Sequence, residues 1–446
     1  MKKLLLVLIL SFVVFSAGCG GYGSMITLTP SAAANAVLNT GDAVNDQILK
    51  FELTISSATL TGTYPTPTSA NLISKPAEVE FVHQAGTFEP LALVSIPAGT
   101  YSGATLIVSN PEVVVLNGGV PTSVPATLSS TTVTVIFTPA ITITDSTTSV
   151  INFDLDLAAS VSLNDSPITS AMVSPKFNVI TSAVAAGENE DNDNGEIEDV
   201  HGRVTNITVP DFTVQTMQAT ITFVTDSNTK FQGGGITQLS DVKVGDVVEV
   251  DGITKADGTK LASRLEKDGA STGEEVEGII TTVTGSPAVG LKIAHQLDST
   301  GMVPPPTTVD VAINSGTAFS VHADKLNLSS LPAFDATRIG NGQRVEADSA
   351  TASFPTIATK LKLREQALVG TVAASPAPTS SGFMLNINPT SAFGTLSGAT
   401  SVAVTVPSGA TLKIAPTAGA ILLVRGLLFF NGTTTYTMIA TREDHN

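Results

Sequence analysis

The amino-acid sequence predicts an all-β protein in which an N-terminal β-sandwich is followed by three small, repeated β-barrel units. Segments rich in Val, Ile, Leu and Thr, interrupted by turn residues about every 8 to 12 positions, predict the sandwich. A pattern of glycines and short apolar strands that occurs three times predicts the barrels. In the 446 residues, no segment of about a dozen keeps the 3.6-residue period of a long helix.

Changes in composition along the chain predict its division into segments. We expect a signal peptide at 1–18, a lipid-bearing cysteine with a short leash at 19–24, the sandwich domain at 25–186 and an acidic linker at 187–199. The three barrel units are expected at 200–269, 274–366 and 367–446.

The first segment has the layout of a secretory signal peptide. Two lysines come first, residues 4–15 are apolar apart from one serine, and residues 16–18 are small. The apolar run is too short to span a bilayer, which needs about 20 residues. We therefore expect the chain to be exported.

Cys19 follows these small residues, and the order resembles the cleavage box of bacterial lipoproteins, whose cysteine becomes the lipidated first residue. The resemblance implies lipid at Cys19 and a place in the bacterial envelope. Gly20, which is not Asp, implies the outer membrane. Ser16 departs from the box, which usually has Leu there, so an ordinary signal peptide followed by an incidental cysteine is the alternative.

The charge balance bears on partners. The chain has 22 Lys and Arg against 39 Asp and Glu, and only 14% of its residues are charged. Nucleic acids and anionic membrane surfaces attract clustered basic residues, so we expect no nucleic acid partner. The single cysteine excludes an internal disulfide.

The sandwich segment shows the two-residue period of half-buried strands. Phe51, Leu53 and Ile55, for example, alternate with polar residues. Stretches at 96–101, 141–145 with 152–156, and 173–177 resemble a domain-of-unknown-function family found behind lipoprotein signals. The resemblance implies a β-sandwich on the cell exterior and brings no known activity.

The linker carries seven acidic residues among thirteen. Its oxygen-bearing residues at alternate positions, Glu190, Asn192 and Asn194, are weak candidates for calcium ligands. His201 stands where a calcium loop has a bidentate Glu, which favours a plain acidic spacer over a calcium site.

The repeated units begin at Gly202, Gly278 and Gly370, and each contains a second glycine before a strand. We expect a tight turn with positive φ at these second glycines, Gly245, Gly342 and Gly419. In the first unit, alternation predicts that Val248 and Val250 face the barrel interior while Glu249 and Asp251 face water. This unit resembles a second domain-of-unknown-function family, of small repeated β-barrels.

Catalytic motifs are missing from the sequence. The histidines lack the spacing of a metal site, and no G-x-S-x-G occurs. The five histidines are His83, His201, His295, His322 and His445.

The sequence therefore predicts a membrane-anchored envelope lipoprotein, a non-enzymatic binding or structural module without a cofactor. Its partners are expected to be the membrane, through the lipid anchor, and an unidentified envelope protein or polysaccharide. An envelope hydrolase with an undetected site and a calcium-binding surface protein are the alternatives.

Overall fold

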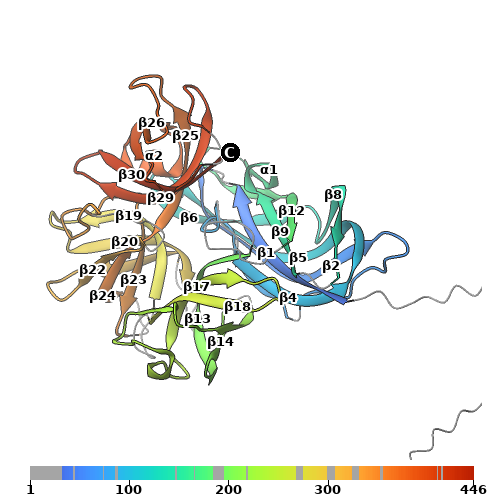
Figure 1. Ribbon diagram of the computed structural model, residues 1–446. Coiled ribbons are helices and arrows are strands. Elements are labelled where there is room, and N and C mark those ends of the chain that lie inside the picture. The colour runs from blue at the N-terminus through green and yellow to red at the C-terminus, as the bar shows by residue number, and fades with distance from the viewer. Residues whose placement is uncertain are drawn as a thin grey trace, which may run out of the picture. The chain divides into compact units, whose positions relative to one another are not determined.

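The computed structural model describes residues 33–43, 46–73, 75–85, 89–145, 148–164, 166–183, 195–216, 219–267, 275–298, 307–323, 331–351, 355–408, 410–412 and 415–445. The chain divides into residues 1–31 and 32–446, and all described residues belong to the second unit. The expected signal peptide, Cys19 and the leash lie outside the described residues. The described chain is built almost entirely of strands, which confirms the predicted all-β class (Figure 1).

The described residues of the N-terminal domain form twelve strands and one short helix, α1 (Leu157–Ser160). The strands are β1 (Ala33–Ala43), β2 (Ile48–Gly62), β3 (Ala77–Glu80), β4 (Glu89–Pro97), β5 (Gly99–Asn117), β6 (Val120–Val124), β7 (Ala126–Leu128), β8 (Thr132–Ile143), β9 (Thr148–Asp156), β10 (Val161–Asn164), β11 (Ser170–Val173) and β12 (Phe177–Ala183).

These strands form a sandwich around one hydrophobic core. One sheet has the order β12-β9-β1-β4, the other has the order β3-β2-β5-β6 with β8 beside β5, and β10, β11 and β7 form a small third sheet. Phe51 on β2 and Phe153 on β9 come from the two main sheets and are both buried in the same core cluster. The alternation seen in the sequence therefore points the apolar side chains of both sheets inward, as predicted.

Each of the three following units is a six-stranded sheet with the same strand order. The first, barrel 1, contains β13 (Glu196–Thr208), β14 (Asp211–Gln215), β15 (Thr220–Val224), β16 (Lys230–Gln232), the 3-10 helix η1 (Leu239–Asp241), β17 (Val247–Thr254) and β18 (Lys260–Lys267). The second, barrel 2, contains β19 (Glu275–Thr284), β20 (Gly290–Asp298), β21 (Thr308–Ala312), β22 (Ala318–Val321), β23 (Arg344–Ser349) and β24 (Thr356–Leu363). The third, barrel 3, contains β25 (Glu365–Val372), β26 (Gly382–Ile387), helix α2 (Ala392–Ser397), β27 (Ser401–Thr405), β28 (Thr411–Leu412), β29 (Ile421–Phe430) and β30 (Tyr436–His445).

Pairing of the third strand with the last strand closes each sheet into a small barrel: β15 with β18, β21 with β24 and β27 with β30. The short strand that follows the third strand pairs further along the same edge of the last strand, as β16 does on β18. Closure leaves few free strand edges, which is how small antiparallel domains avoid unwanted pairing.

The three barrels share one register, which confirms that they are repeats. The first and fifth strands pair at equivalent positions, which are His201 with Glu249, Glu277 with Glu346, and Val369 with Leu423. A bulge of one extra residue interrupts the last strand at the same place in all three units, next to the partners of Asp251, Asp348 and Arg425 on the fifth strand.

The predicted turn glycines are confirmed in all three barrels. Gly245, Gly342 and Gly419 have φ angles of 98°, 86° and 83°, a region that residues with a Cβ rarely adopt. Each glycine N–H donates a hydrogen bond to a carbonyl of the first strand, with a distance of 2.8 Å from Gly245 to Val204. The glycines therefore fix how the fifth strand enters each barrel.

The two barrel-to-barrel interfaces differ in chemistry. Leu427, Phe429 and Ile439 of barrel 3 belong to the hydrophobic core cluster of barrel 2, so this interface is apolar. A few hydrogen bonds accompany it, such as the one from Gln343 Nε2 to the Leu428 carbonyl at 2.8 Å. Barrel 1 instead meets barrel 2 through charged side chains.

Candidate functional site

The most unusual feature of the described chain is a buried cluster of charged side chains between barrel 1 and barrel 2, which we call the charged interface. Its carboxyl groups belong to Glu249, Asp251, Glu266, Glu275, Glu277, Glu346 and Asp348. Its basic groups belong to Arg264, Arg344, Lys360, Lys362 and Arg364, and two histidines, His201 and His322, complete it. All of these residues are buried except His201 and Lys360, which are half-buried.

Strand alternation places these side chains on the outer faces of the barrels. On β17, Val248 and Val250 enter the core of barrel 1, so Glu249 and Asp251 point outward. On β23, Val345 and Ala347 enter the core of barrel 2 in the same way. The charged interface therefore forms where the equivalent outer faces of two repeats meet.

The prediction that Glu249 and Asp251 face water is wrong. Their exposed fractions are 0% and 7%. Alternation correctly predicts that both side chains leave the core of barrel 1, but barrel 2 covers the face onto which they emerge.

Glu249 is the centre of the charged interface. One carboxylate oxygen lies 3.0 Å from Nε2 of His322, and the other lies 2.7 Å from Nη1 of Arg364 and 3.1 Å from Nζ of Lys362. Arg264 of the same barrel also pairs with it. Burial alone would raise the pKa of Glu249, but the surrounding cations, Arg264 and Arg364 foremost, together hold it well below its ordinary value.

A second set of ion pairs crosses the interface at Glu266. Its carboxylate lies 2.7 Å from Nη1 of Arg264 within barrel 1 and 2.7 Å from Nζ of Lys360 in barrel 2. Burial opposes ionisation of Glu266, yet Lys362 and Lys360 outweigh burial and the nearby Glu249, and the pKa falls to about 2. This carboxylate is therefore charged at neutral pH.

Lys362 and Arg364 serve carboxylates of both barrels. Nζ of Lys362 lies 3.1 Å from both Glu249 and Glu346. Nη1 of Arg364 lies 2.7 Å from Glu249 and 3.1 Å from Glu346. These two cations therefore connect β17 of barrel 1 to β23 of barrel 2.

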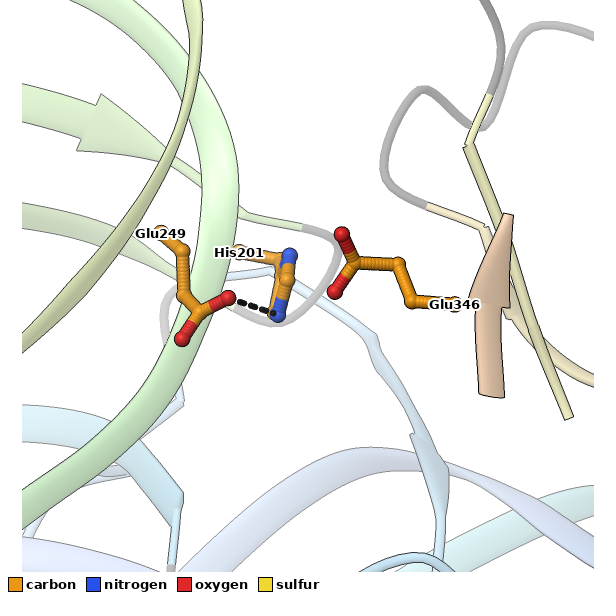
Figure 2. Close-up of side chains that lie close together, drawn as sticks. All are labelled: His201, Glu249 and Glu346. Carbon is orange, nitrogen blue, oxygen red and sulfur yellow. Dashed lines mark ion pairs between the residues drawn. The ribbon is translucent and has the colours of Figure 1, made fainter. Parts of the chain in front are cut away.

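The imidazole of His201 lies between carboxylates of the two barrels (Figure 2). Nε2 lies 3.5 Å from Glu249, and Nδ1 lies 3.1 Å from Oε1 of Glu275. Burial alone would lower the pKa of His201, but Glu275 and Glu249 outweigh it and raise the pKa well above its ordinary value. We therefore expect His201 to be protonated near neutral pH.

Three carboxyl groups of barrel 2, those of Glu275, Glu346 and Asp348, lie close together within the charged interface. Each offers an oxygen, and these oxygens all lie within 4.8 Å of one another. Burial, together with the neighbouring Glu275 and Glu249, raises the pKa of Glu346 against the opposing pull of Lys362 and Arg364. Such a group of oxygens can hold a cation.

Two arginines connect the barrels to the sandwich domain. Arg344 pairs with Glu277 at 2.7 Å and donates to the carbonyl of His83 at 3.3 Å. Arg425 of barrel 3 donates to the carbonyls of His83 and Ala85 at 3.2 and 3.0 Å. The loop after β3 therefore receives hydrogen bonds from two barrels.

A small cavity of about 80 Å³ lies beside these arginines, where the sandwich, barrel 2 and barrel 3 meet. Its lining includes Leu49, His83, Arg344, Gln366 and Phe393. One water molecule requires roughly 10–15 Å³ of such cavity volume, so the cavity has room for a few waters.

The candidate site residues chosen from the sequence are Cys19 and three residues of the acidic linker. Cys19, Glu190, Asn192 and Asn194 lie outside the described residues. The sequence did hold one usable signal: Glu-x-Asp recurs at equivalent outward positions, as Glu249 and Asp251 and as Glu346 and Asp348. Repeated acids on the same outer face can indicate that two repeats meet there.

Comparisons with known proteins identify one part of the chain. Residues 201–266 match the family described as Domain of unknown function (DUF5666), so a domain-of-unknown-function family is present in the C-terminal part. Comparison with curated proteins gives no match. Among the helices of the described residues, none has the length and apolar character to cross a membrane.

A solved structure from Streptococcus pneumoniae TIGR4, described as a multidomain protein with nucleic acid binding domains, also matches. The sequence identity is 14%, the match covers 54% of this chain and 72% of that chain, and the TM-score is 0.12. A likeness at this TM-score carries no argument about what this chain binds.

The expectation that nucleic acid is excluded as a partner is corrected: it was drawn from net charge alone, and the matching protein is described as having nucleic acid binding domains. Net charge describes a whole chain, whereas recognition depends on the charges of one surface. The acidic balance of the sequence therefore does not exclude this class of partner.

Proposed function

We propose that this chain is an exported envelope protein, lipid-anchored at Cys19, that acts as a non-enzymatic structural module. The order of the first residues supports the anchor: a positive start, an apolar run at 4–15, small residues and then Cys19. Because Gly20 follows the cysteine, we propose the outer membrane as the location.

The structural role is supported by the ion pairs that connect barrel 1 to barrel 2 across the charged interface. Lys362 and Arg364 each contact carboxylates of two different barrels. Breaking a buried pair leaves an uncompensated charge, so such pairs favour one arrangement of their domains over others. A chain with this construction is suited to holding its domains in a fixed order outside the cell.

We propose, further, that all three barrels belong to the family whose match covers only the first. They share strand order, turn glycine, bulge position and register. For the N-terminal sandwich we propose membership of the lipoprotein-associated family that residues 96–101 and 173–177 resemble.

Fatty-acid labelling in a bacterial host tests the anchor. We expect the wild-type chain to incorporate label and to sediment with membranes, and Cys19→Ala to lose both properties. Ser16→Leu, which restores the usual residue of the cleavage box, is the matched control and should keep both. Equal labelling of wild type and Cys19→Ala would contradict the proposal.

A further inference from the structure

We propose that Glu275, Glu346 and Asp348 form a binding site for one calcium ion within the charged interface. These three residues belong to barrel 2 and differ from the linker residues that the sequence suggested. The site is independent of the lipid anchor, since it depends only on the folded barrels.

The backbone brings the three carboxyl groups together. Glu275 on β19 pairs directly with Asp348 on β23, and Glu346 lies two residues before Asp348 on the same face. Calcium binds oxygens at about 2.3–2.6 Å, so two of its ligands can lie up to roughly 5 Å apart. The limit of 4.8 Å between the three ligand oxygens satisfies this requirement.

The second observation is an unsatisfied oxygen. Oε2 of Glu275 is buried and has no hydrogen-bond partner among the described residues, and Glu275 as a whole is only 6% exposed. A buried carboxylate oxygen without a partner is costly. Glu275 also stands opposite another acid, and like charges directly opposite each other destabilise a strand pair. A cation between Glu275 and Asp348 would remove both penalties.

The charged interface has more acidic than basic groups. Its seven carboxyl groups face five Lys and Arg side chains and the protonated His201, which leaves one negative charge to be balanced by a bound cation or by a proton. The cations now beside Glu346 have other partners. Lys362 also contacts Glu249 and Glu266, and Arg364 also contacts Glu249. Both can therefore stay paired while Glu346 binds calcium.

The chemistry favours calcium over magnesium. Carboxylate oxygens are ligands that calcium prefers, and its flexible coordination tolerates an irregular arrangement of them. Magnesium usually retains several waters, for which a buried site has little room.

Calorimetric titration of the full chain with CaCl₂ at neutral pH tests the proposal. We expect one calcium ion per chain, with a dissociation constant on the order of 10⁻⁴–10⁻³ M, as in extracellular modules. Glu275→Gln and Asp348→Asn should each weaken binding at least about tenfold, because each removes one charged ligand. Both substitutions keep the size of the side chain. If one variant fails to fold, the calcium affinity of the other still tests the proposed site.

Two matched controls separate this site from other acidic groups. Asp310→Asn removes an exposed acid of the same barrel, whose carboxylate pairs with Lys292 at 2.7 Å. Glu190→Gln removes a linker candidate. Both should bind calcium like the wild type. No binding by the wild type up to about 10 mM would overturn the proposal, as would loss of binding in Glu190→Gln with retention in Glu275→Gln.

Discussion

Barrel 2 meets its two neighbours through opposite chemistry, although all three barrels have the same strand order and register. At equivalent outward positions, barrel 1 carries Glu249 and barrel 2 carries Glu346, whereas barrel 3 carries Leu423. Barrel 1 meets barrel 2 through the charged interface, whereas Leu427, Phe429 and Ile439 of barrel 3 pack into the core of barrel 2. A shared backbone fixes where a side chain points, and the side chain decides which neighbour that surface accepts.

The two interfaces should also differ energetically. Apolar burial stabilises in proportion to area, at about 25 cal/mol per Å². Burying ion pairs costs desolvation that roughly cancels their attraction, so the charged interface contributes little net stability while intact. Removing one partner of a buried ion pair, however, leaves the other charge uncompensated and destabilises the protein.

The largest effect is expected for Glu249→Gln. This change leaves Arg264, Lys362 and Arg364 without their shared carboxylate, and the loss of one partner of a buried pair costs about 3–5 kcal/mol. Calorimetric melting of the full chain measures it. Asp310→Asn, at an exposed pair, should cost less than about 1 kcal/mol. Equal effects of the two changes would mean that the charged interface is solvated.

Leu427→Ala probes the apolar interface and should cost about 3 kcal/mol, because Leu427 is fully buried in the cluster shared by barrels 2 and 3. The loss should be nearly independent of pH and salt, in contrast to that of Glu249→Gln. Melting at low and high salt tests this. A loss that falls steeply with salt would remove the distinction between the interfaces.

The turn glycines offer a smaller, internal comparison. Gly245→Ala should cost about 1 kcal/mol from its positive φ alone, since open space surrounds its missing Cβ. Gly342→Ala should cost more, because its Cβ would lie 2.7 Å from the ring of Phe393 in barrel 3. Chemical denaturation of both variants measures the two losses in the free energy of unfolding. A larger loss at Gly245 would contradict this packing.

The smallest effect on stability is expected for His201→Gln, and this effect should depend on pH. Its pKa is raised in the folded chain, so its contribution to stability is complete below the unfolded value of about 6.5 and is lost as pH rises through the folded value. Wild type should therefore lose its advantage over His201→Gln as the pH rises.

His295 provides a control of opposite sign for this pH dependence. Burial lowers its pKa to about 4, so its contribution to stability is present above pH 6.5 and lost as the pH falls. Melting midpoints between about pH 5 and 8 test both trends. A similar pH trend in His201→Gln and His295→Gln would contradict the assignment.

The fold was largely predictable from the sequence, whereas the charged interface was not. Alternation such as that of Phe51, Leu53 and Ile55 reports which face of a strand is apolar, and Gly245 marks a turn that only glycine adopts easily. Neither signal says what covers an outer face. Glu249 and Arg364 are 115 residues apart, and their contact depends on how two closed barrels meet.

A double-mutant cycle between Glu249 and Arg364 tests the charged interface most directly. Their side chains lie 2.7 Å apart across two barrels. Unfolding free energies of wild type, Glu249→Gln, Arg364→Met and the double variant should give a coupling of about 1–3 kcal/mol, since both residues belong to one buried network. Additive losses, within about 0.3–0.5 kcal/mol, would show that the barrels are not joined through this pair.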